Sequence, residues 1–112
     1  MEKKMRVRLR PEAMVKIAEL AEKMHDKKKE WDNLPLPKQI DRSCSKHLRS
    51  EQLKVAGELL DMLDNREIMV FGASSCDVDC ATGAHVSIKA VSKETGEEVK
   101  VLTIGPRSVS FL

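Results

Sequence analysis

The sequence LLDMLDNREIMVF, residues 59–71, contains the point at which the chain changes from one type of secondary structure to the other. Up to Leu63 the apolar residues recur at helical spacing. From Glu67 the pattern changes to period two and to β-branched residues, beginning with the apolar run 68–71. The sequence therefore predicts a mainly helical half, residues 1–66, followed by a β-rich half, residues 67–112.

Two helices are predicted upstream of this boundary. The first begins at Pro11, because proline suits the first helical position, and apolar residues then recur at helical spacing until residue 29 or 30. The second begins at a capping residue, either Asp41 or Ser50, and ends near Asp64.

The segment between these helices, residues 31–39, contains the sequence Leu-Pro-Leu-Pro. Each proline pushes the residue before it out of helical conformation, so the segment is predicted to be an extended connection. A short and stiff connection favours a helical hairpin, in which the two helices lie antiparallel.

Period-two alternation predicts the strands. Apolar residues alternate with arginine over residues 5–9, before the first helix. In the β-rich half, residues 74–83 are expected to form a turn-rich loop, and a Thr-Gly turn near residue 95 is expected to close a hairpin. The predicted strands of this half are residues 68–71, 84–91, 98–104 and 108–111.

The expected fold class is α+β, because the order strand, helix, helix, four strands differs from the alternating order of a doubly wound sheet. We expect a short N-terminal strand and a two-helix hairpin packed with a small antiparallel sheet of about four strands. A length of 112 residues suits a single domain with one core.

The composition limits the functions that the chain can have. Aromatic residues make up 3% of the sequence, which argues against nucleic-acid binding by stacked bases. A net charge of +2 is too small to indicate nucleic acid by itself. The sequence contains neither a nucleophile elbow nor a phosphate-binding glycine-rich loop, so we expect no enzyme activity and no cofactor.

The sequence also predicts a cytoplasmic protein. No apolar run approaches the roughly 20 residues of a membrane span, and the basic start lacks the apolar segment of a signal peptide. Three cysteines, an odd number, argue against a disulfide framework and leave free thiols or a metal site.

A cluster of cysteine and histidine is the candidate metal site. The cluster has five cysteine and histidine side chains, and zinc would accept four of them. Cys44 and His47 share a helix face, and a loop could bring two thiolates together. The alternative is that the cysteines are a small core residue and ordinary free thiols, and we favour it. The candidate ligands are Cys44, His47, Cys76, Cys80 and His85.

The basic N-terminal strand is a second candidate site. Arg6, Arg8 and Arg10 alternate with apolar residues directly before an amphipathic helix. This pattern, over about the first 24 residues, resembles the opening of ribbon-helix-helix repressors, whose paired strands enter the major groove of DNA. Arginines that protect a strand edge against aggregation are the alternative, which we favour.

A further resemblance covers more of the chain. The segments GAHVSI at residues 83–88, TGEEV at 95–99 and IGP at 104–106, after a helical hairpin, resemble the Gre transcript-cleavage factors and their relatives. The resemblance implies binding to RNA polymerase. In that family the hairpin tip carries two acidic residues that help the polymerase bind a second magnesium ion. The sequences KKKEWD at residues 27–32 and LPLP at 34–37 do not reproduce that pair, so the implied activity is polymerase binding without stimulated cleavage.

The hairpin connection is the predicted partner-binding surface. A single tryptophan, Trp31, with Leu34 and Leu36 nearby has the composition of an interface core, and flanking lysines would steer an acidic partner. The alternative is that these apolar residues fold back as core. The lysines assigned to this surface are Lys27, Lys28 and Lys29.

These observations predict a small non-enzymatic regulator or adaptor that binds a protein partner, with RNA polymerase as one candidate. The alternative is a DNA-binding transcriptional regulator that uses the basic N-terminal strand.

Overall fold

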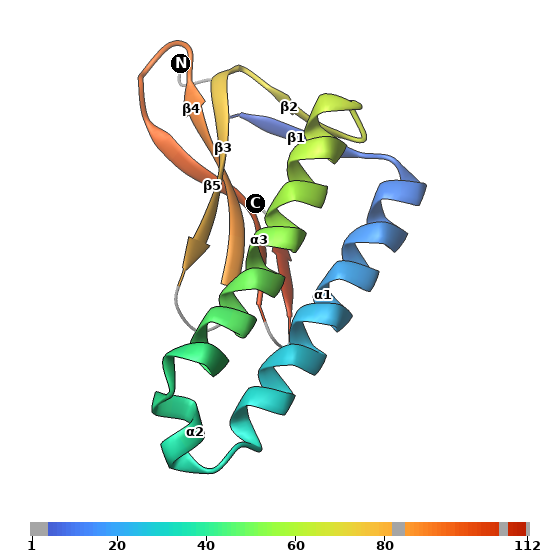
Figure 1. Cartoon of the computed structure of the whole chain (residues 1–112). Helices are drawn as coiled ribbons and strands as arrows, with labels where there is room; N and C mark the ends of the chain where they lie inside the picture. Colours follow the sequence, from blue (N-terminus) through green and yellow to red (C-terminus); the bar gives the residue numbers. More distant parts are fainter. Residues whose placement is uncertain (1–4, 82–84, 106–107, 112) are drawn as a thin grey trace.

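A computed structural model describes residues 5–81, 85–105 and 108–111 of the chain. It contains both helices and antiparallel strands, and it confirms the α+β class (Figure 1). The elements are β1 (Arg6–Leu9), α1 (Pro11–Asp32), α2 (Leu36–Ile40), α3 (Arg42–Asp64), β2 (Ile68–Phe71), β3 (Ala73–Ala81), β4 (His85–Ser92), β5 (Glu98–Ile104) and β6 (Val109–Phe111).

The strands form two antiparallel sheets. β3, β4, β5 and β6 lie side by side in that order in a four-stranded sheet, while β1 pairs with β2 in a separate ribbon. Helices α1 and α3 cover one face of the larger sheet, α3 against β3 and β4, and α1 against β5 (Figure 1). One face of an antiparallel sheet is therefore packed and the other is open to solvent.

The core lies between the two long helices and the sheet. Its fully buried members come from both layers, and their side chains are aliphatic or methionine, as the composition predicts. The largest are Ile17, Met24, Val55, Leu59, Met62, Ile68, Val86, Ile88, Val101, Leu102 and Ile104.

The extended connection predicted for residues 31–39 is wrong. α1 continues through Trp31 to Asp32, and the Leu-Pro-Leu-Pro sequence enters the short helix α2. Pro35 is the N-cap of α2 with extended backbone, and Pro37 lies in the first turn, where a missing N–H loses no helical hydrogen bond. α3 then begins at Arg42, which agrees with Asp41, and not Ser50, as the residue before the second long helix.

The loop predicted for residues 74–83 is also wrong over most of its length. β3 occupies it as far as Ala81 and pairs with β4, with Val78 opposite Ile88. The period-two pattern is present when cysteine is counted as apolar, since Cys76 and Cys80 lie on the core side with Val78. Residues 82 and 83 lie outside the described residues.

A glycine separates the ribbon from the larger sheet. Gly72, between β2 and β3, has φ 84°, a left-handed backbone conformation that residues other than glycine rarely adopt. A β-carbon built there would meet the Met5 side chain at 3.7 Å, an ordinary contact. The backbone conformation, and not crowding, therefore requires glycine at this bend.

Candidate partner-binding surface at the hairpin tip

The end of α1, all of α2 and the start of α3 form the tip of the helical hairpin, which extends beyond the end of the sheet (Figure 1). Two large apolar side chains of α2 are exposed there: Leu36 is 68% exposed and Ile40 is 73% exposed. They are four residues apart in one helix and so share a face. Among the described residues, these are the two most exposed of the large apolar side chains.

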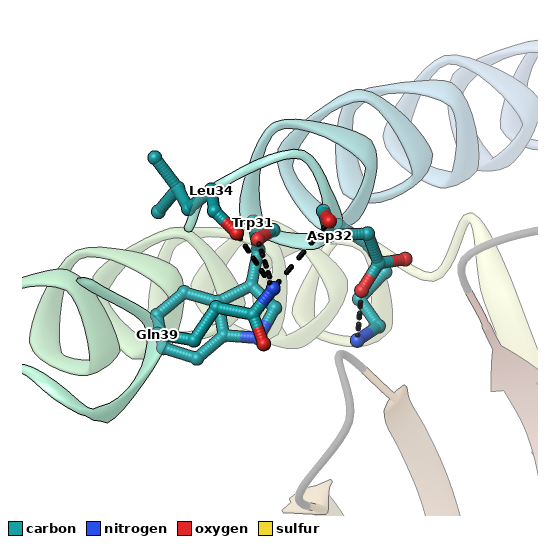
Figure 2. Close-up of polar contacts among 5 residues, drawn as sticks. Trp31, Asp32, Leu34 and Gln39 are labelled. Atoms are coloured by element: carbon teal, nitrogen blue, oxygen red, sulfur yellow. Dashed lines mark hydrogen bonds and ion pairs between the residues drawn. The ribbon is translucent and has the colours of Figure 1, made fainter. Parts of the chain in front are cut away.

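The amide of Gln39 attaches α2 to the end of α1. Its Nε2 atom lies 3.2 Å from the carbonyl oxygen of Trp31 and 3.0 Å from that of Leu34. The carbonyl oxygen of Asp32 is 3.4 Å away, so three carbonyls share two amide hydrogens (Figure 2). The last carbonyls of a helix have no partner within the helix, and Gln39 supplies one. This contact holds the Leu36 and Ile40 face in one orientation.

We expect Gln39→Ala to lower the free energy of unfolding by about 1 kcal/mol, the usual net value of a lost hydrogen bond. Urea denaturation would measure it. Lys38→Ala, at the exposed position before Gln39, should change the free energy of unfolding by less than about 0.5 kcal/mol. Equal losses for the two variants would show that the Gln39 amide does not stabilise the tip.

The three apolar residues predicted for this surface differ in exposure. Trp31 and Leu34 are half-buried, whereas Leu36 is exposed. Sequence reasoning misses Ile40, because its four-residue spacing from Leu36 has meaning only in a helix and the sequence predicts an extended segment. The exposed apolar surface at the tip is therefore formed by Leu36 and Ile40, whereas Trp31 and Leu34 are partly buried.

The predicted lysines differ in their surroundings. Lys27 Nζ lies 3.4 Å from Glu30, and Lys28 Nζ lies 2.8 Å from Asp32, so both pair with acids of the same helix. Such exposed pairs contribute less than about 1 kcal/mol. Lys29 is exposed on the same turn. Acids of the same helix therefore balance part of the positive charge of these three lysines.

The candidate zinc ligands are not brought together. Cys76 and Cys80 lie on one strand, where four residues span about 13 Å, a distance too great for two ligands of one zinc ion. His85 belongs to the opposite sheet face from Cys80, because its neighbour Val86 is the residue that pairs with Cys80. His47 is exposed on α3, and the side chain of Cys44 lies outside the described part of the chain. In that part, no group of three His, Cys, Asp or Glu residues could hold a metal ion.

Burial governs the chemistry of the two described thiols. Desolvation raises the pKa of Cys76 above its ordinary value. It also raises the pKa of Cys80, where the Arg49 guanidinium acts in the opposite direction and the Asp79 carboxylate adds to the rise. The Cys80 thiol donates a hydrogen bond to the carbonyl of Gln52 at 3.8 Å. Both residues are therefore protonated packing residues at neutral pH.

This burial predicts a pH effect. Because the folded pKa values are raised, the unfolded chain loses these protons first, and the free energy of unfolding should be unaffected at neutral pH and fall as pH rises past 9.0. At pH 8, iodoacetamide should modify Cys76 and Cys80 more slowly in the native chain than in urea, with mass spectrometry assigning each site. Equal rates in the two states would contradict burial of these thiols.

The basic strand has one exposed face. Arg6 and Arg8 point to solvent, and the Arg8 guanidinium carbon lies 5.7 Å from the centroid of the Phe71 ring. β1 pairs along its length with β2 of the same chain, with Arg8 opposite Met69. Arg10 is exposed and directly precedes α1.

No family model, no curated protein and no solved structure matches this chain. Within the described residues, no helix is long and apolar enough to span a membrane.

Proposed function

We propose that this chain is a small non-enzymatic regulator or adaptor that binds a protein partner through the tip of its helical hairpin. The observation that carries the proposal is the pair of side chains Leu36 and Ile40, which are 68% and 73% exposed on one face of α2. Large apolar side chains that gather at an exposed, structured position are typical of interaction sites.

The organisation of the tip supports this proposal. The Gln39 amide orders α2 before any partner binds, which reduces the conformational entropy lost on binding. Two exposed lysines at the tip, Lys29 at the end of α1 and Lys38 on the side of α2 away from Leu36 and Ile40, would favour an acidic partner surface. An apolar centre with a charged rim is the usual arrangement of a protein interface.

RNA polymerase is the partner to test first. The resemblance of the segment from residue 83 to residue 106 to Gre factors implies it, and a hairpin with a sheet attached would suit that mode of binding. Since the tip does not reproduce the acidic pair of that family, the chain would bind the polymerase without stimulating transcript cleavage. The proposal implies a cytoplasmic protein with no cofactor.

Binding of DNA by the β1 ribbon is the alternative, and the exposed Arg6 and Arg8 favour it. A capture experiment separates the two. The purified chain is immobilised and exposed to an extract of its own cells, with and without nuclease treatment. Proteins retained equally in both samples support the proposal. Retention that nuclease removes, and that Arg6→Ala with Arg8→Ala abolishes in the untreated sample, would assign the function to DNA.

A further inference from the structure

The outer edge of β3 is a second surface with the geometry of a binding site. β3 is the first strand of the larger sheet and has a strand neighbour, β4, on one side in the described sheet. It is nine residues long, whereas β6 at the opposite edge has three. Alternate residues of an edge strand direct their backbone N–H and C=O groups away from the sheet, where another strand can pair with them.

An apolar shelf on α3 lies beside this edge. Arg49, Leu53 and Leu60 share one face of the helix, at spacings of four and seven residues. α3 packs against β3, and the backbone carbonyl of Gln52, the residue before Leu53, accepts a hydrogen bond from the Cys80 thiol. Leu53 is 56% exposed and Leu60 is 47% exposed.

The shelf is long enough to contact a strand. Leu53 and Leu60 are about 10 Å apart along the helix axis, and side chains on one face of an extended chain recur about every 6–7 Å, so two successive inward side chains fit along the shelf. α3 and β3 run in opposite directions, side by side (Figure 1). A strand added beside β3 would thus place its inward side chains against these two leucines, as a continuation of the apolar layer formed by Cys76, Val78 and Cys80.

The opposite face of the same edge is acidic. A hollow of about 200 Å³ opens on the uncovered side of the sheet. Three carboxylates line it with one ammonium group, Lys89, whose Nζ lies 3.3 Å from Asp79 and 3.5 Å from Glu98. The charge of the hollow is negative. Its lining residues are Ser75, Asp77, Val78, Asp79, Lys89, Val91 and Glu98.

From these two faces we infer that the β3 edge binds an extended segment of a partner protein in which basic side chains alternate with apolar ones. The apolar side chains contact Leu53 and Leu60, and the basic ones reach Asp77 and the acidic hollow. A second copy of this chain is a poor occupant, because antiparallel pairing of two β3 strands about Val78 places Asp77 opposite Asp79. This surface is separate from the hairpin tip.

The test uses two acetylated and amidated eight-residue peptides, one alternating lysine with valine and the other alternating glutamate with valine. Titration of the purified full chain should show at least tenfold tighter binding of the lysine peptide. Asp77→Lys should weaken that binding at least tenfold. Glu97→Lys, the same charge change on the β4–β5 turn, should leave it within about twofold, and Leu53→Asp should weaken it as Asp77→Lys does.

Hydrogen exchange places the peptide on the chain. Bound lysine peptide should slow the exchange of β3 amides at least tenfold and leave those of β6 unchanged. The variant with Leu36→Asp and Ile40→Asp should bind this peptide as tightly as the natural sequence does. Failure of the hairpin-tip proposal can therefore be distinguished from failure of the β3-edge inference. Equal affinity for the two peptides, equal effects of Asp77→Lys and Glu97→Lys, or a dimer paired through β3 would overturn the inference.

Discussion

Leu59→Ala is expected to lower the free energy of unfolding by about 2–5 kcal/mol, far more than truncation of an exposed side chain. Leu59 is 0% exposed and lies on the face of α3 that packs against the sheet. Truncation removes buried apolar surface and leaves a cavity that the surrounding side chains can only partly fill. A domain of this size is stable by about 5–15 kcal/mol, so one such change removes a large share of that stability.

The adjacent residue provides a matched control. Leu60 is chemically identical but 47% exposed, since one step along a helix turns the side chain by about 100°. Leu60→Ala should therefore cost less than about 1 kcal/mol. Urea denaturation of both variants measures the difference, and equal losses would mean that α3 does not pack on the sheet through the face assigned to it.

The helical half shows what a single sequence can predict. Pro11 and the change of pattern at Glu67 mark the start of α1 and the start of the β-rich half, because these signals act through local backbone geometry. Helix α2 is not predicted because Pro35 and Pro37 are interpreted as helix breakers, although proline in a first turn favours a helix. The Gln39 contact depends on how α1 and α2 meet, which no local pattern encodes.

The β-rich half shows a different limit. The sequence predicts a loop in place of β3 because Asp77 and Asp79 favour turns in isolation. Pairing with β4 overrides that preference, and each aspartate faces solvent while Val78 faces the core. The same error produces the candidate zinc site, since Cys76 and Cys80 could meet at one metal ion in a loop but not along a strand.

The second large effect concerns binding. Replacing Leu36 and Ile40 together with aspartate should reduce partner retention at least tenfold, equivalent to about 1.4 kcal/mol or more of binding free energy. The substitutions remove the apolar centre of the tip and introduce charge into a surface that must be desolvated. Because both side chains are largely exposed, the free energy of unfolding should change by less than about 1 kcal/mol.

Val15→Asp is the matched control for this variant. Val15 is 62% exposed on α1, away from the tip, so the substitution adds the same kind of charge at a comparably exposed apolar position. A decrease in retention for Val15→Asp as large as that for the tip variant would indicate a general effect of charge and not the loss of a specific surface.

Binding through the hairpin tip is tested most directly by quantitative mass spectrometry of the proteins that three immobilised chains retain from a nuclease-treated extract. The three chains are the natural sequence, the tip variant and Val15→Asp. We expect a defined protein, with RNA polymerase subunits as the first candidates, to be retained by the natural sequence and Val15→Asp and reduced at least tenfold on the folded tip variant. Equal retention of that protein by all three chains would contradict binding through Leu36 and Ile40.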